Sequence, residues 1–255
     1  PPRSTLFPYT TLFRSTMIFR EAKTVIVPGR IDDAWREVMQ LCVQDGWDFV
    51  VKGGSYVGQI RKQLEYVQIV IGQPGARPLS PILPPSITPT TSDEAIEKYF
   101  LNYLLSEKVA EKENYTYGSF VVPQIDSLIA ILNKAKGNTN QACIAIGNQE
   151  SIFLSDPPCL RLVSFKVVRE RLVMSVFFRS WDLYAGLPEN LGGLQLLKEY
   201  VLANLDFWCQ DGPLIAYSDG LHIYEQYFSI VDLLNVDKIT VEERAVREKK
   251  ALGIL

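Results

Sequence analysis

The sequence contains very little of the two residue types that most often bind transition metals. Of its 255 residues only one is histidine, His222, and the four cysteines are widely spaced with no Cys-x-x-Cys pair. Structural zinc sites need closely spaced cysteine and histidine ligands, so we expect no metal site. Widely spaced cysteines also favour free thiols in a reducing compartment, and we expect the protein to be cytoplasmic.

The chain also lacks a surplus of positive charge and a long apolar run. Its 26 basic residues are fewer than its 29 acidic residues, which gives a formal net charge of −3. A chain with this balance has no overall electrostatic attraction to nucleic acid or to anionic membranes. No apolar stretch approaches the roughly 20 residues of a membrane-spanning helix. We therefore expect neither nucleic acid nor a membrane among its partners.

The first fifteen residues, PPRSTLFPYTTLFRS, lack the patterning of the rest of the chain. They show neither a helical nor a strand period, and one choice of codons back-translates them into a common sequencing-library adapter. A signal peptide is the alternative, but Pro8 interrupts the apolar run and no small-residue cleavage site follows. We expect residues 1–15 to be a non-native tail and residues 17–255 to form a single domain.

The hydrophobic periods predict a mixture of strands and helices. We expect strands at 24–27, 64–71, 142–146 and 214–217, and helices at 33–42 (capped by Asp32), 93–105 (capped by Ser92), 124–135, 189–205 and 224–234. Two β-rich runs, 159–168 and 171–178, are joined by Arg169-Glu170 and predict a hairpin or a pair of adjacent strands. Residues 74–92 hold six prolines and predict a long irregular connection. Strict βαβ alternation is missing, which favours an α+β fold.

The segment from Asp156 to Leu197 holds the most informative side chains. Cys159 follows two prolines and opens a strand, so its thiol is held on a rigid backbone; an inert buried cysteine is the simpler alternative. Arg179 ends the next strand, where a hairpin would return it close to Cys159. Beside a thiol it would lower the pKa of that thiol and bind phosphate. A surface ion pair is the simpler alternative for this arginine.

Four motifs occur in order along this part of the chain: Pro-Cys at 158–159, Arg-Ser-Trp-Asp at 179–182, Gly-Leu-Pro-Glu-Asn at 186–190 and His-Ile-Tyr at 222–224. In order and spacing they resemble the thymidylate synthase family, and most closely its archaeal-type members. The match covers roughly 115–227. The resemblance implies one α+β catalytic domain in which a mixed β-sheet packs against helices. It also implies a homodimer formed through the sheet face.

The same resemblance implies a role for each matching residue. Cys159 resembles the nucleophile, Asn190 the amide that reads uracil, and Asp182 the carboxylate that contacts the folate. Tyr117, in the motif YTYG, resembles the tyrosine beside C5 of the base. We count these four as catalytic. The substrate-binding positions are Arg179 and Ser180 at the phosphate, His222 and Tyr224 at the deoxyribose 3′-hydroxyl, together with Trp181, Asp182, Asn190 and Arg61.

The sequence also departs from the family pattern. Asn140 and Gln141 stand where the family has two arginines that reach the phosphate of the partner subunit. Arg61 resembles the N-terminal phosphate arginine, and Arg161 is a second candidate because strand alternation places it on the same face as Cys159. Leu160 replaces the histidine that often follows the nucleophile, and Glu97 is a provisional choice for the glutamate that orders water near the base. The C-terminal KKALGIL does not match the usual closing tail.

The activity that the resemblance implies is reductive methylation of dUMP to dTMP. The carbon donor would be 5,10-methylenetetrahydrofolate or a related reduced pterin, with Cys159 bound covalently to the base. Two other functions remain open: a dUMP or dCMP hydroxymethylase of the same fold, and a non-catalytic nucleotide-binding homologue. An amide at Asn190 complements both O4 and N3–H of uracil, whereas an aspartate there would suit the amino edge of cytosine.

Overall fold

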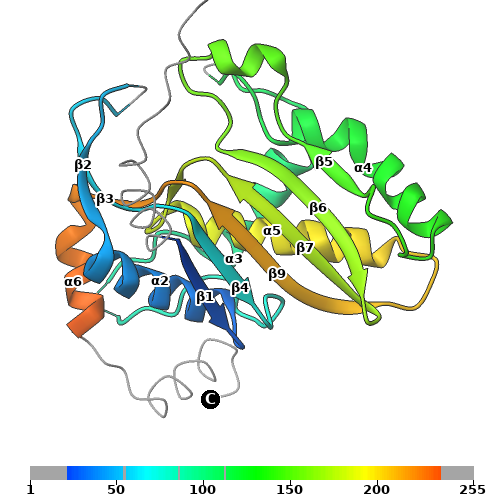
Figure 1. Ribbon diagram of the computed structural model, residues 1–255, viewed down its shortest axis with the longest axis horizontal. Helices are drawn as coiled ribbons and strands as arrows, with labels where there is room; N and C mark the ends of the chain where they lie inside the picture. The colour runs from blue at the N-terminus through cyan, green and yellow to red at the C-terminus, as the bar shows by residue number, and fades with distance from the viewer. Residues whose placement is uncertain (1–21, 54–55, 86, 112, 237–255) are drawn as a thin grey trace, which may run out of the picture.

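The fold was analysed in a computed structural model that describes residues 22–53, 56–85, 87–111 and 113–236. The adapter-like stretch 1–15 and the C-terminal KKALGIL lie outside these residues. The described chain forms two β-sheets and a set of helices, which confirms the predicted α+β class (Figure 1).

The larger sheet is mixed and has six strands in the order β1-β4-β9-β7-β6-β5. The bounds of these strands are Lys23–Val27 (β1), Val67–Ile71 (β4), Gln210–Ser218 (β9), Arg171–Phe178 (β7), Leu160–Val168 (β6) and Cys143–Ala145 (β5). The pairs β1·β4 and β7·β9 are parallel, and the other three pairs are antiparallel.

A smaller sheet has four strands in the order β2-β3-β10-β8. Their bounds are Trp47–Val50 (β2), Ile60–Leu64 (β3), Leu221–Tyr224 (β10) and Trp181–Asp182 (β8).

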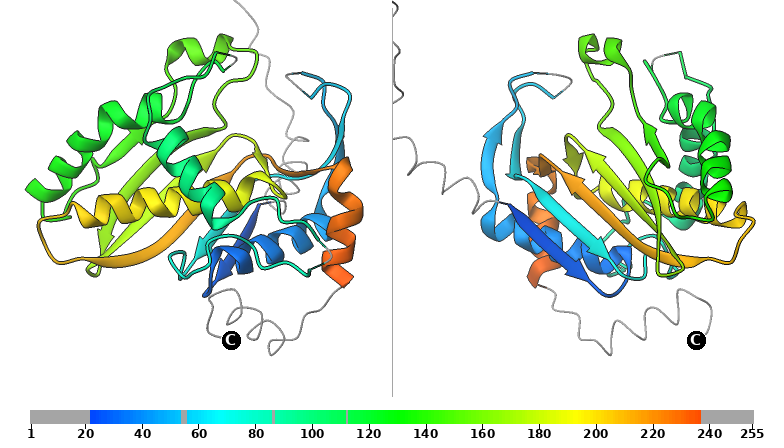
Figure 2. Two further views of the ribbon diagram at one scale, coloured as in Figure 1. Left: turned by 180° about the vertical axis from the view of Figure 1, so that it is seen from behind. Right: turned by 45° about the vertical axis from the view of Figure 1, so that its right-hand side comes forward.

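The helices of the described residues cover one face of the larger sheet and leave the other face open. They are α2 (Ile31–Asp45), α3 (Asp93–Tyr99), the π-helical turn η2 (Phe100–Leu104), α4 (Gly118–Lys134), α5 (Gly186–Ala203) and α6 (Phe228–Val236), with short 3₁₀ turns η3 (Gln149–Phe153) and η4 (Glu225–Tyr227). In Figure 1 the strands stand in front of α3 and α5, and the left panel of Figure 2 shows these helices from the other side. The core lies between the two layers, where Phe165, Met174 and Val176 of the sheet and Leu194 and Leu197 of α5 are fully buried.

At three places the chain passes directly from one sheet to the other through a connection of two residues. It crosses from β3 to β4 at Glu65-Tyr66, from β7 to β8 at Arg179-Ser180, and from β9 to β10 at Asp219-Gly220. The last two crossings lie side by side, since the backbone N–H of Trp181 donates to the carbonyl of Gly220 at 2.9 Å. The polar residues that follow the ends of β7 and β9 are therefore brought together at one edge of the fold.

Several predicted elements are confirmed. The runs 159–168 and 171–178 form the β6–β7 hairpin, with Arg169 and Glu170 in the left-handed conformation (φ 50° and 62°) that a tight two-residue turn requires. Ser92 caps α3 by accepting the N–H of Ala95 at 3.2 Å. The proline-rich connection 74–92 contains no helix or strand among its described residues.

Three predicted elements are wrong in detail. The single strand at 64–71 is two strands in different sheets, because Tyr66 adopts a left-handed φ of 54° and turns the chain. The helix at 224–234 begins only at Phe228, and Tyr224 instead ends β10. Asp32 is not the cap of α2, which begins at Ile31; the Asp33 carboxylate accepts the N–H of Arg30 at 2.7 Å.

Candidate functional site

A cavity of about 620 Å³ opens where the two sheets meet. All ten residues that the sequence singles out as catalytic or substrate-binding line it: Arg61, Tyr117, Cys159, Arg179, Ser180, Trp181, Asp182, Asn190, His222 and Tyr224. They come from β3, β8, β10, the first turns of α4 and α5, and the ends of β6 and β7. The crossings between the sheets explain how residues so far apart in sequence share one cavity.

Cys159 and Arg179 are neighbours, as the hairpin predicts. The backbone N–H of Arg179 donates to the carbonyl of Cys159 at 2.9 Å, and its guanidinium Nε donates to the carbonyl of Pro158 at 3.1 Å. An ion pair of 3.5 Å joins the same guanidinium to Asp156. Arg179 thus holds the loop that carries the half-buried thiol.

The pKa of the Cys159 thiol is nevertheless raised in the unliganded chain. Burial is the main cause and Asp156 adds to it, while the positive charges of Arg179 and Arg61 pull the pKa down. Arg179 does lower the pKa of the Cys159 thiol, as expected. The effect of burial is larger, so the net shift is upward. Anything that strengthens the positive field at the sulfur will therefore increase the reactive thiolate fraction.

Arg61 provides a second cation in the cavity. It lies on β3 between Phe49 and Tyr224, which are its register partners on β2 and β10. Its guanidinium carbon is 4.7 Å from the centre of the Phe49 ring, and its Nε is buried with no hydrogen-bond partner among the described residues. Burial is the main cause that lowers the pKa of Arg61, and the positive charge of Arg179, which lines the same cavity, lowers it further. Two like charges held together in this way favour an anionic ligand.

Asn190 sits in the first turns of α5, with its side-chain amide held from both sides. Its Oδ1 accepts the indole N–H of Trp181 at 2.9 Å, and its Nδ2 donates to the Tyr99 hydroxyl at 3.0 Å. Trp181 belongs to the predicted site, whereas the sequence gives no sign of Tyr99, which lies 91 residues before its partner. Each amide atom retains one further hydrogen-bonding position.

Asp182 ends β8 just before α5 begins. Its Oδ1 accepts the backbone N–H groups of Tyr184 and Ala185 at 3.0 and 3.2 Å. Burial raises the pKa of this carboxyl to about 6, although those hydrogen bonds act in the opposite direction. The group is thus able to hold or release a proton near neutral pH.

His222 is buried and neutral. Its Nδ1 lies 3.0 Å from the carbonyl of Gly220, which assigns the ring proton to Nδ1 and leaves Nε2 as an acceptor. Nε2 is buried and has no partner among the described residues. Burial lowers the pKa of His222 to about 4, so at neutral pH the ring accepts a hydrogen bond from a ligand hydroxyl instead of adding charge.

Tyr117 places a phenol beside the nucleophile. Its hydroxyl oxygen accepts the backbone N–H of Leu160 at 3.2 Å, directly after Cys159 in the chain. Burial raises its pKa well above 10, with the neighbouring Cys159 as the next cause, so the phenol keeps its proton at neutral pH. Tyr103 contacts it edge to face with ring centres 5.2 Å apart, which fixes the ring.

Two other sequence candidates, Arg161 and Glu97, do not line this cavity. Arg161 points away because a β-bulge between Leu160 and Leu162 breaks the strand alternation, and its guanidinium packs at Gly147. Glu97 is exposed on α3. Asn140 and Gln141, at the place of the family's two partner-directed arginines, are exposed ahead of β5.

Neither a metal site nor a membrane span is found in the described part of the chain. Within it no group of three or more His, Cys, Asp or Glu side chains could hold a metal ion. Among the described helices none is long and apolar enough to cross a membrane.

Comparisons with known proteins identify the family and the fold of the chain. The chain is 26% identical over 209 residues to a protein of Methanothermobacter marburgensis named "Putative thymidylate synthase", covering 78% of this chain and 92% of that one. It is 30% identical over 108 residues to the thymidylate synthase of Wigglesworthia glossinidia brevipalpis, covering 41% of this chain and 40% of that one. The solved structure of thermostable thymidylate synthase A from Bacillus subtilis shares the fold, with a TM-score of 0.60 at 16% identity over 80% of this chain and 83% of that one. A family profile described as thymidylate synthase matches residues 103–244, which is more than half of the sequence, and the chain therefore belongs to the thymidylate synthase family.

Proposed function

We propose that this protein converts dUMP to dTMP by reductive methylation, with Cys159 as the covalent nucleophile. The observation that carries the proposal is the single cavity lined by the thiol, two arginines, a fixed amide and a buried neutral histidine. Each group complements one part of a deoxyuridine monophosphate. Family membership supports the reaction class.

The nucleotide would be held at three points. Arg179, Arg61 and the Ser180 hydroxyl bind the phosphate, since two adjacent guanidiniums provide the charge that an uncharged Asn140-Gln141 pair cannot. Nε2 of His222 accepts the 3′-hydroxyl, beside the Tyr224 ring 4.8 Å away. Asn190 pairs with O4 and N3–H of the base.

The chemistry begins at the sulfur. The Cys159 thiolate adds to C6 of the ring, which breaks the C5–C6 double bond and moves an electron pair toward O4, where Asn190 stabilises the charge. C5 thereby becomes the nucleophile that takes up the one-carbon unit. Loss of the C5 proton would expel the folate nitrogen from the newly attached carbon, and hydride would then reduce that carbon to a methyl group. Expulsion of Cys159 would finally restore the C5–C6 double bond. The protonated Tyr117 phenol orders the proton acceptor near C5.

A reduced folate fits the remaining part of the site. Asp182 lines the same cavity with a carboxyl whose pKa of about 6 lets it exchange a proton with a pterin ring at neutral pH. When bound, the folate supplies first the one-carbon unit and then the hydride that reduces it. No residue of this chain needs to carry a redox group.

The functional enzyme would be a homodimer packed through the uncovered face of the larger sheet. Leu162, Phe177 and Tyr217 are cross-strand neighbours on β6, β7 and β9, and Leu162 and Tyr217 are 36% and 40% exposed. No described helix covers this row (Figure 1). A contiguous apolar strip of this kind favours burial against a second copy.

The proposal is tested by incubating the protein with dUMP and methylenetetrahydrofolate and identifying the products by mass spectrometry. We expect dTMP and dihydrofolate in equal amounts. A 5-hydroxymethyl product would instead indicate a hydroxymethylase, in which water replaces hydride. Binding of dUMP without any product would indicate a non-catalytic homologue.

The nucleophile is tested with 5-fluoro-dUMP and the same folate. Fluorine replaces the C5 proton and cannot leave as a cation, so a covalent ternary complex should accumulate on the peptide that contains Cys159. Cys159→Ser should abolish it, because a hydroxyl is far less ionised than a thiol. Cys209→Ser is the matched control: this cysteine is also half-buried but lies at β9 outside the cavity lining, and the adduct should form unchanged. An adduct on a cysteine other than Cys159 would contradict the assignment.

A further inference from the structure

The orientation of the Asn190 amide is fixed by a donor that cannot change its role. An indole N–H only donates, so the amide atom 2.9 Å from Nε1 of Trp181 must be the oxygen. The nitrogen then faces the Tyr99 hydroxyl at 3.0 Å. A phenol hydroxyl both donates and accepts, so Tyr99 would tolerate either amide atom. Of the two partners, only Trp181 distinguishes the two orientations.

Turning the amide over would carry a cost. A turned amide would direct its NH₂ group at the indole N–H, and a buried donor would face another donor with no acceptor between them. Tyr99 would rotate its hydroxyl hydrogen and donate to the oxygen instead. A cytosine ring presents the reverse of the uracil pattern, an amino donor and a bare N3 acceptor, so it requires the turned amide.

Trp181 is itself held rigidly. Its ring stacks on Phe178 at 4.0 Å between centres with the planes 4° apart, and only 3% of the residue is exposed. Its backbone N–H is bonded to Gly220 across the sheet crossing. The indole therefore cannot swing aside to accommodate a turned amide.

Tyr99 is held by a close helix contact. A side chain at Gly193 of α5 would collide with the Tyr99 ring, and one at Gly192 would meet Ile96 at 2.8 Å. The two glycines lower the intrinsic stability of α5 and allow α3 to approach it. The Gly192-Gly193 pair thus connects helix packing to the amide that faces the base.

We propose that Trp181 is the positioning residue that makes the cavity specific for uracil over cytosine, by fixing the Asn190 amide in one orientation. This inference rests on the proposed function, because it takes Asn190 as the residue that reads the base. Trp181 needs no contact with the base for this role. Without the Trp181 indole, the Asn190 amide could take the orientation that uracil requires or the one that cytosine requires.

The experiment compares dissociation constants for dUMP and dCMP by calorimetry in three variants and the wild-type protein. Discrimination is the dissociation constant for dCMP divided by that for dUMP. In Trp181→Phe this ratio should fall about tenfold or more, as expected for the loss of one buried hydrogen-bond preference. In Tyr99→Phe both constants should rise while their ratio changes less. Trp35→Phe is the matched control: Nε1 of Trp35 donates to the carbonyl of Leu183 at 2.9 Å, outside the cavity, and the ratio should remain that of the wild type.

An isostere tests the same hydrogen bond if Trp181→Phe does not fold. Benzothienylalanine placed at position 181 keeps the ring shape and replaces the N–H with sulfur, so it should relax the ratio in the same way. An unchanged ratio with either substitution would overturn the inference and leave the proposed function standing. An equal loss of discrimination in Tyr99→Phe would also overturn it. Failure of the wild-type protein to bind either nucleotide would overturn the proposed function, and the inference with it.

Discussion

Asp182 combines two roles that make opposite demands on its charge. The N–H groups at the start of α5 favour the carboxylate, while burial in the cavity favours the neutral acid and raises the pKa to about 6. A carboxyl with a raised pKa binds its proton more tightly in the folded than in the unfolded chain. Its stabilising contribution is therefore full below the unfolded pKa of about 4 and is lost as the pH rises through about 6.

Asp182→Asn should abolish the fall in stability that ionisation of Asp182 causes as the pH rises. The amide oxygen still accepts the N–H groups of Tyr184 and Ala185, but no charge appears in the cavity as the pH rises. We expect the variant to gain stability relative to the wild type between pH 4 and pH 7, by about 1–3 kcal/mol, and to lose most of its activity. Thermal midpoints of both proteins across this range measure the difference. His222, whose pKa is lowered to about 4, makes stability rise with pH instead. Its contribution is the same in both proteins and cancels in the difference between them. A difference that does not vary with pH would contradict the assignment.

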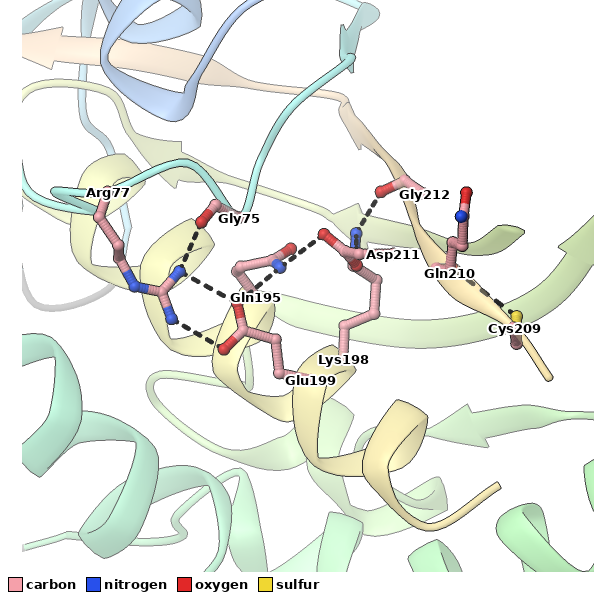
Figure 3. A network of polar contacts seen from close by, with 9 residues as sticks. All are labelled: Gly75, Arg77, Gln195, Lys198, Glu199, Cys209, Gln210, Asp211 and Gly212. Carbon is pink, nitrogen blue, oxygen red and sulfur yellow. Dashed lines mark hydrogen bonds and ion pairs between the residues drawn. The ribbon is translucent and has the colours of Figure 1, made fainter. Parts of the chain in front are cut away.

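At the scale of elements, a polar network built around one buried lysine connects the proline-rich segment to the core (Figure 3). Lys198 of α5 is fully buried and forms an ion pair of 3.0 Å with Asp211 of β9. Gln195 joins Asp211 to Glu199, with 3.0 and 2.9 Å from its Nε2 to the two carboxylates. Glu199 binds Arg77, at the start of the connection, through two hydrogen bonds of 3.0 and 2.8 Å.

Asp211→Asn should be strongly destabilising. It leaves the buried Lys198 ammonium without its closest negative charge. Breaking a fully buried pair typically costs about 3–5 kcal/mol, and because Asp211 is itself 34% exposed we expect a loss toward or below the lower end of that range. Urea unfolding monitored by circular dichroism measures the loss. Asp206→Asn is the matched control, because its ion pair with Lys136 is exposed and should contribute no more than about 1 kcal/mol. Equal losses in the two variants would show that the network does not stabilise the fold.

These elements also show what the sequence can and cannot predict. The β6–β7 hairpin and α5 follow from local periodicity and turn residues, so they were predicted correctly. The run at 64–71 has the same β-rich composition throughout, and only the backbone turn at Tyr66 divides it between two sheets. Lys198 gives no local sign of burial, since its partner Asp211 lies on a different element. The pairing of Tyr99 with Asn190 is likewise a tertiary contact that periodicity cannot reveal.

For the whole molecule, the most informative surface is the face of the larger sheet that no described helix covers (Figure 1). Two parallel rows cross it: Leu162, Phe177 and Tyr217 form the apolar row, and Ser164, Ser175 and Ile215 form the row beside it. Small serines beside large apolar side chains form hollows next to ridges. Such a surface allows the side chains of two copies to interdigitate, as close packing at an interface requires. The two-fold symmetry of a homodimer would place this face against itself.

Tyr217→Arg should therefore dissociate the dimer. Tyr217 lies within the apolar row, so a two-fold axis brings two new positive charges into the same interface, where they lose hydration and repel each other. Light scattering after size-exclusion chromatography should give twice the 28.8 kDa chain mass for the wild type and the single-chain mass for the variant. Leu233→Arg is the matched control, since Leu233 is 61% exposed on α6, away from the sheet face, and this variant should remain dimeric. A wild-type protein of single-chain mass, or a Tyr217→Arg variant of double mass, would show that this face is not the interface.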